Sequence, residues 1–294
     1  MKSNYPETMR ETWFNRLLIL NIAVQAGIIV TGGVVRVTAS GLGCPTWPEC
    51  VDGSITPTDA QTEAWHKYVE FGNRTLTGVL FVVAILVAIA VFQRTTDRRM
   101  RLLGMGSLLG TFGQALLGGV TVLTGLNPYT VASHLLLSIV IVALCVRLWW
   151  NFEHSTEATS PARAWFSRVF VAVAAIVVVL GTLVTGSGPH SGDTKSLTRM
   201  PFEPRVIAWV HADAVWLFVG LIIASYALIR FGQVSMKTRT SLNWLTAVVL
   251  LQGLVGYAQY FKGLPALLVA VHVLGATLVW VATLVTARHI RYGD

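Results

Sequence analysis

Long apolar runs alternate with short polar connections along the whole chain. Each run holds about 20 residues, which is enough for a helix to cross the hydrocarbon core of a bilayer. Charged residues or clusters of Gly and Pro bound every run. The runs predict spans over residues 17–37, 70–93, 102–124, 129–150, 166–186, 206–229, 241–261 and 265–287. We therefore expect an all-α integral membrane protein with eight transmembrane helices.

Composition and charge support a multi-pass membrane protein. Of 294 residues, 54% are hydrophobic and 12% charged, which excludes a soluble enzyme and a disordered chain. The net charge of +8 does not indicate nucleic-acid binding, because the basic residues collect at alternate span ends rather than on one surface. Lys and Arg mark cytoplasmic connections, so both termini are expected in the cytoplasm.

An internal repeat divides the chain into two halves. Gln114 recurs as Gln252 and His134 as His272, at a constant offset of 138 residues. Since the matching spans cross in the same direction, the halves are parallel repeats. We expect two four-helix bundles, over residues 1–150 and 151–294.

Three of the seven histidines, His134, His211 and His272, lie inside apolar spans. With Asn73, which the same offset aligns with His211, they belong to first turns of outside-to-inside spans and so form one layer near the outer face. A buried histidine can simply pack between helices. A repeat-related set at one depth indicates function instead, because ionisable groups within membrane spans are costly. Imidazoles that face each other across a bundle suit axial ligation of a haem iron.

Glu70 belongs to the first half alone, since its counterpart is Ala208. It lies on the same helix face as Asn73. It is either a catalytic carboxylate or a solvated residue at the membrane edge. The histidine pair, by contrast, is complete only in the second half. This asymmetry predicts a permanent six-coordinate haem in the second half and a less saturated site beside an acid–base group in the first.

The arginines and cysteines near the outer ends of the spans each have two possible interpretations. Arg36, Arg74 and Arg205 are candidates to neutralise haem propionates, or they reach toward the interface as long basic side chains often do. Cys44 and Cys50 flank the segment CPTWPEC in an outer loop, where an oxidising environment favours a disulfide. That disulfide staples the loop or has a redox role.

The chain resembles haem A synthase. The resemblance rests on TGGVVRVTASGLGCPTWPEC, on EFGNRTLTG at 70–78, and on the segments around the three histidines: SHLLLS, VHAD and VHVLGA. It implies that one methyl group of the substrate haem O is oxidised to a formyl group, giving haem A for cytochrome oxidase. It also implies that His211 and His272 hold haem b, that His134 binds the substrate haem, and that Glu70 is the catalytic carboxylate.

One position departs from the family pattern. Many members have histidine where this chain has Asn73, and asparagine is a poor iron ligand. The substrate iron is then five-coordinate on His134, which we favour, or His66 supplies the missing ligand from the loop.

The resemblance also implies partners: the enzyme that produces haem O, and a redox partner whose identity the sequence does not indicate. Gly-rich span faces suggest a homo-oligomer. The main alternative is a b-type membrane cytochrome that exchanges electrons with quinone. It explains the histidine pair but leaves Glu70 without a task. A transporter is disfavoured because the polar layer lies at the outer edge and not at the midplane.

Overall fold

The computed structural model describes residues 7–59, 61–154, 160–194, 198–231 and 235–293. The described part of the chain forms eight helices, each long and apolar enough to cross a membrane. They are α1 (Glu7–Val37), α2 (His66–Arg94), α3 (Arg98–Leu123), α4 (Pro128–Glu153), α5 (Pro161–Ser187), α6 (Pro204–Phe231), α7 (Met236–Phe261) and α8 (Ala266–Tyr292). The eight predicted spans are therefore confirmed, although most helices extend beyond the predicted limits.

Capping residues explain part of that extension. Asn127 accepts a hydrogen bond from the backbone of Tyr129, and Ser160 accepts one from the backbone of Arg163. In both cases proline occupies the first helical position, where its missing N–H costs nothing. Because such caps satisfy the free backbone groups of the first turn, these helices begin in the polar residues that precede the apolar run.

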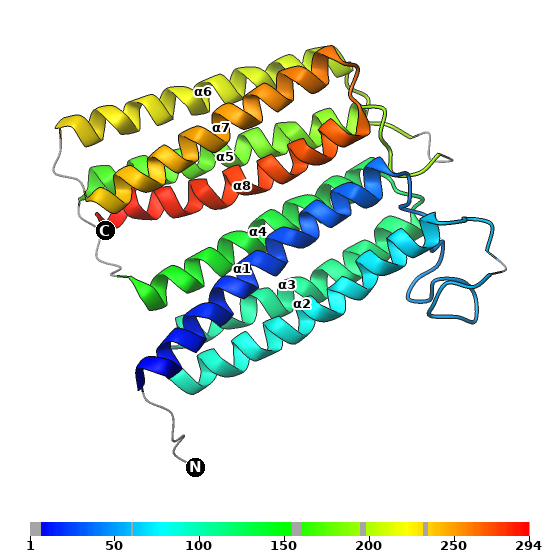
Figure 1. Ribbon diagram of the computed structural model, residues 1–294, viewed down its shortest axis with the longest axis horizontal. Coiled ribbons are helices and arrows are strands. Elements are labelled where there is room, and N and C mark those ends of the chain that lie inside the picture. The colour runs from blue at the N-terminus through cyan, green and yellow to red at the C-terminus, as the bar shows by residue number, and fades with distance from the viewer. Residues whose placement is uncertain (1–6, 60, 155–159, 195–197, 232–234, 294) are drawn as a thin grey trace.

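The helices form two side-by-side groups (Figure 1). In the first group α1 contacts α2, α2 contacts α3, α3 contacts α4, and α4 returns to α1, so that α2 and α4 occupy opposite corners. The second group has the same plan for α5 to α8, with α6 and α8 at opposite corners, although α6 touches α7 only lightly. The groups meet where α1 and α4 pack on α8 and where α4 packs on α5.

The chain enters and leaves the helical body at the same end. α1 begins and α8 ends at this end, whereas the two long connections lie at the other end (Figure 1). We call them the terminal end and the loop end. The connection between α3 and α4 has Gly125 and Leu126 at φ 62° and 59°, and that between α7 and α8 has Gly263 and Leu264 at φ 73° and 61°. Turns 138 residues apart thus share one backbone form.

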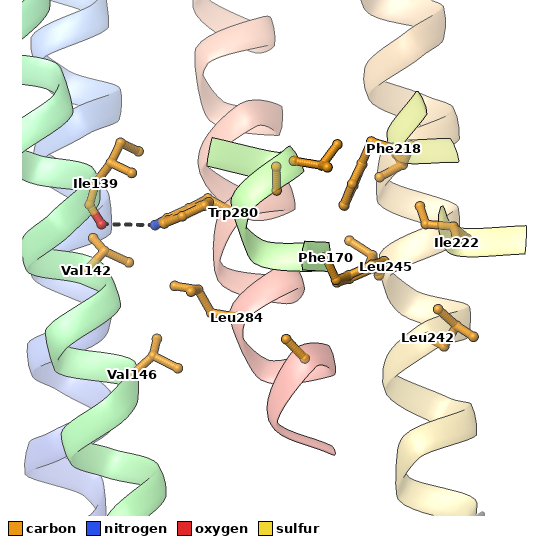
Figure 2. Close-up of a cluster of buried hydrophobic side chains, with 14 of the residues drawn as sticks. Ile139, Val142, Val146, Phe170, Phe218, Ile222, Leu242, Leu245, Trp280 and Leu284 are labelled. Carbon is orange, nitrogen blue, oxygen red and sulfur yellow. Dashed lines mark hydrogen bonds between the residues drawn. The ribbon is translucent and has the colours of Figure 1, made fainter. Parts of the chain in front are cut away.

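A hydrophobic cluster joins α4 to the four helices of the second group (Figure 2). Trp280 of α8 lies at its edge and donates a hydrogen bond of 3.0 Å from its indole Nε1 to the backbone oxygen of Ile139 on α4. Apart from Pro128, the buried residues of α4 begin at Ser138, and those of α8 begin at Thr277. The densest packing of both helices therefore lies on the terminal side of His134 and His272.

Trp280→Phe should weaken the junction between the two helix groups. It removes the hydrogen bond to Ile139 and leaves space in a packed cluster, so the expected loss is about 1–2 kcal/mol of unfolding free energy. Thermal unfolding in detergent should show a Tm several degrees lower. Trp165→Phe is the control, since Trp165 is 64% exposed. Equal Tm values for the two variants would contradict a structural role for Trp280.

Candidate functional site

The α4 and α8 histidines occupy equivalent surroundings. A Cβ added at Gly118 of α3 would lie 3.4 Å from Cε1 of His134, and one added at Gly256 of α7 would lie 3.2 Å from Cε1 of His272. Both rings therefore pack closely against the backbone of the preceding helix. A side chain in place of either glycine would push the ring, so the small residues help to set its position.

Two glutamines hold the backbone beside these histidines. Gln114 donates a 2.8 Å hydrogen bond through Nε2 to the carbonyl oxygen of His134, and Gln252 does the same to His272. Inside an apolar span such bonds tie neighbouring helices together. Sequence analysis identified these glutamines only as repeat markers. Their identical spacing of 20 residues before each histidine was the available signal for a shared role.

His211 reaches the same layer from α6. A Cβ added at Gly181 of α5 would lie 3.3 Å from its Cε1, and a backbone group of Val177, also on α5, lies near the ring. The His211 and His272 rings are within electrostatic reach of each other. Because α6 and α8 occupy opposite corners of their group, these two imidazoles come from opposite sides of it.

The three intramembrane imidazoles share an unusual feature. The Nδ1 atoms of His134, His211 and His272 are buried and have no hydrogen-bond partner among the described residues. Buried polar atoms are normally paired, because leaving one unpaired costs free energy. A ring held by close backbone contacts with its Nδ1 enclosed by protein can present its other nitrogen, Nε2, to a metal ion. Two such rings from opposite corners of a helix group match the donor set of a haem iron.

A bare metal ion is a poorer match. Among the described residues, no group of three or more His, Cys, Asp and Glu side chains could hold one. A structural or catalytic zinc site requires at least three protein ligands at close spacing. The donor set of this layer therefore fits an iron that already has equatorial ligands.

In the first group, the position equivalent to His211 has different chemistry. Asn73 accepts a 2.7 Å hydrogen bond at Oδ1 from the hydroxyl of Thr31 on α1. The segments VTASG at 37–41 and VTGSG at 184–188 relate α1 to α5 at an offset of 147 residues. At this offset Thr31 corresponds to Val178 and Val34 to Gly181. The first group thus has Asn73 in place of the His211 imidazole and Val34 in place of Gly181, the glycine that this imidazole contacts. Sequence analysis singled out Asn73 but missed its partner Thr31.

Glu70 is buried, with 5% of its surface exposed, so it is not a solvated residue at the membrane edge. Its Oε2 accepts a 2.6 Å hydrogen bond from the backbone N–H of Cys44. Its Oε1 accepts bonds of 3.0 and 2.6 Å from Nε and Nη2 of Arg74, one helical turn further on. These bonds fix the carboxylate in one orientation, three residues from Asn73 on the same helix.

Arg74 also holds the first outer loop in place. Its guanidinium donates to the carbonyl oxygens of Cys44, Thr46 and Glu49, at 2.6, 2.9 and 3.1 Å. One arginine thus connects the buried carboxylate to the segment that lies above it. Within the described residues, the Glu70–Arg74 contact is the only ion pair.

The same segment contains a disulfide between Cys44 and Cys50, as the sequence predicted. Both cysteines are fully buried. Between them Trp47 packs on α3, where a Cβ at Gly119 would meet its ring at 2.6 Å. Since Gly118 lies beside His134, the stapled loop covers α3 next to the histidine layer.

The remaining predicted residues have other contacts. Arg36 donates 2.8 Å bonds to the carbonyl oxygens of His190 and Thr185, and thereby joins α1 to the second outer loop. The guanidinium of Arg205 lies 4.8 Å from the ring centre of Trp209. His66 begins α2 rather than lying in the loop, and its Nδ1 is 2.9 Å from the hydroxyl of Ser40. His66 therefore contacts Ser40, about two helical turns before Asn73 on α2.

Comparison with known proteins identifies the family of the chain. The family of cytochrome oxidase assembly proteins, COX15-CtaA, matches residues 15–285. The chain is 24% identical to a protein named "Heme A synthase" from Listeria monocytogenes, over 89% of the chain and 90% of that protein. It is 28% identical to one of the same name from Methylobacterium sp., over 87% and 84%. A third, from Lysinibacillus sphaericus, is 31% identical over about half of each chain, 53%. The chain belongs to the COX15-CtaA family of cytochrome oxidase assembly proteins.

Proposed function

We propose that this protein is a haem A synthase, which oxidises a methyl group of haem O to the formyl group of haem A for cytochrome oxidase assembly. The observation that carries the proposal is the asymmetry of the histidine layer. Unpartnered imidazoles occur in both helix groups, but a buried and oriented carboxylate accompanies only one of them. The relatives named for this activity support the same conclusion.

In the second group, we assign His211 and His272 as the axial ligands of a haem b. Their origin on opposite corners of the helix group supports this assignment. When bound, a haem supplies an iron that accepts and passes on single electrons. The protein contributes rigid ligand positions, through the close contacts at Gly181 and Gly256 and through the bond from Gln252.

In the first group, we assign His134 as the ligand of the substrate haem O and Glu70 as the catalytic carboxylate. Glu70 stabilises positive charge or takes up a proton beside the reacting methyl group. Arg74 and the Cys44 backbone keep its oxygens in one orientation, so both are positioning groups. The hydrogen bond between Asn73 and Thr31 supports a substrate iron with one protein ligand, and His66 is engaged with Ser40.

Among the arginines, Arg205 is the best candidate to neutralise a haem propionate. It is exposed at the loop end, and its guanidinium has no carboxylate partner among the described residues. Arg36 and Arg74 already donate to backbone carbonyls or to Glu70, so a propionate would share them. The loop end then faces the outside of a bacterial cell membrane, and both termini lie in the cytoplasm, as the charge distribution favours.

The proposal implies that this protein receives its substrate from the enzyme that makes haem O and that a redox partner takes up the electrons. Close approach of Gly-rich helix faces would support a homo-oligomer. The alternative, an electron-carrying b-type cytochrome, leaves the buried Glu70–Arg74 pair and its clamped loop without a purpose.

His211→Ala and His272→Ala should each abolish the low-spin b-type spectrum of the purified protein, because each removes one of two axial ligands. His134→Ala is the matched control, since it removes the equivalent α4 residue and should leave that spectrum in place. Absorption spectra of the reduced proteins provide the measurement. Loss of the low-spin bands in His134→Ala, or their survival in His272→Ala, would show that the haem sites are assigned wrongly.

Glu70→Gln should retain the low-spin haem b but form haem A at least about 100-fold more slowly, the usual scale for losing an acid–base group. Asp213→Asn is the control, because Asp213 is an exposed carboxylate on a span. Turnover is followed by chromatography of extracted haems after haem O is supplied. Normal turnover of Glu70→Gln would remove this carboxylate from the mechanism.

Asn73→His should restore a second imidazole to the first group. We expect haem O bound there to change from a high-spin form that binds carbon monoxide to a low-spin form that does not. Asn243→His, an exposed change on α7, should leave carbon monoxide binding unaltered. If the unsubstituted protein already holds haem O in a low-spin form that excludes carbon monoxide, the one-ligand assignment is wrong.

A further inference from the structure

A groove of about 660 Å³ lies far from the histidine layer, along α7 and α8. It begins where α7 starts and α8 finishes, at the terminal end (Figure 1). Its two parts differ in chemistry. Val248, Leu278 and Val281 belong to an apolar stretch that continues into the span, whereas Lys237, Ser241 and His289 lie at the terminal end.

The terminal part of the groove is suited to an anion. Lys237 is exposed in the first turn of α7, where free backbone N–H groups give the helix end a partial positive charge. The hydroxyl of Ser241 lies at the same end but already donates its proton to the carbonyl oxygen of Thr238 at 3.0 Å, so the positive charge for an anion comes from Lys237 and the helix end. Among the residues that the structure describes, no Asp or Glu lines the groove.

Other basic residues lie near the C-terminal end of α8, although they do not line the groove. Arg288, next to His289, lies within electrostatic reach of Arg147 on α4 and of Arg291. The neighbouring carboxylate, Glu153 at the end of α4, is exposed and lies near Arg94 and Glu11. A cluster of like charges at a membrane surface is stabilised when an anion binds among them.

The apolar part of the groove faces the surrounding lipid. Leu278 is 49% exposed and Trp244 is 68% exposed, so the groove wall is accessible from the bilayer. Trp244 lies between the charged and the apolar parts, at the depth where tryptophan is typical of a membrane–water interface. The occupant must therefore combine an anionic head with an apolar chain.

We propose that this groove binds an anionic phospholipid, with its phosphate at Lys237 in the first turn of α7 and an acyl chain along Val248, Leu278 and Val281. The site lies at the face that the basic residues assign to the cytoplasm, where basic pockets between helices bind anionic headgroups. It is independent of the proposed haem chemistry, because none of its residues belongs to the histidine layer.

The test compares phosphatidylglycerol with phosphatidylcholine of the same acyl chains, added to the delipidated full-length protein in detergent. Phosphatidylglycerol should raise the Tm in a saturable way, and phosphatidylcholine should raise it much less. Lys237→Gln should weaken the phosphatidylglycerol midpoint about fivefold, which is the factor that about 1 kcal/mol for one basic residue represents. Arg239→Gln is the matched control, because it removes an exposed cation of the same helix that does not line the groove.

A second variant tests the apolar part. Ala282→Trp should fill the groove and reduce the rise in Tm that phosphatidylglycerol causes. If Ala282→Trp does not fold, Lys237→Gln still tests the proposal, because it changes an exposed side chain and leaves the fold intact. Equal stabilisation by both lipids, or equal weakening by Lys237→Gln and Arg239→Gln, would overturn the proposal. Inorganic phosphate alone that raises the Tm as much as phosphatidylglycerol does would also overturn it. So would a neutral quinone that is recovered with the unsubstituted protein but not with Ala282→Trp.

Discussion

A bilayer offers no hydrogen-bond partners, so polar groups within the spans must satisfy one another. The structure meets this constraint at most buried polar positions. Gln25 pairs with Thr111, Asn21 with Cys145, and Glu70 with Arg74 and the Cys44 backbone. Other buried polar atoms, such as Asn21 Oδ1 and Gln114 Oε1, also have no partner, but the three imidazoles are distinguished by their repeat-related positions within the spans. The functional assignment depends on those positions more than on the number of histidines.

The duplicated fold explains how one architecture serves two tasks. Both groups retain the glutamine that fixes a histidine backbone and the glycine that receives its ring. At the opposite corner they differ, because the second group has His211 against Gly181 and the first has Asn73 bound to Thr31. In the proposed function, two imidazole ligands suit electron transfer, because they would leave no open position on the iron. A site with an open position and an oriented carboxylate suits chemistry on the ligand itself.

Much of this could be predicted from the sequence, for physical reasons. Bilayer thickness sets the length of an apolar span, so all eight helices were predicted from the apolar runs. The offset of 138 residues identified the histidine layer and isolated Glu70, because a repeat exposes the positions that depart from it. The clamp formed by Arg74 could not be predicted, since its partners are backbone carbonyls of a loop whose path has no periodicity. Neither could the Thr31–Asn73 bond, which depends on how α1 is rotated against α2.

The central claim is that this chain converts haem O to haem A. The most direct measurement is chromatography of haems extracted from cells that lack their own haem A synthase, express this chain and contain a haem O-producing enzyme. The account predicts that haem A appears only when the chain is present. The account would be contradicted if only haem O persisted. That result counts in cells where the protein is inserted, shows its b-type spectrum and is supplied with electron acceptors.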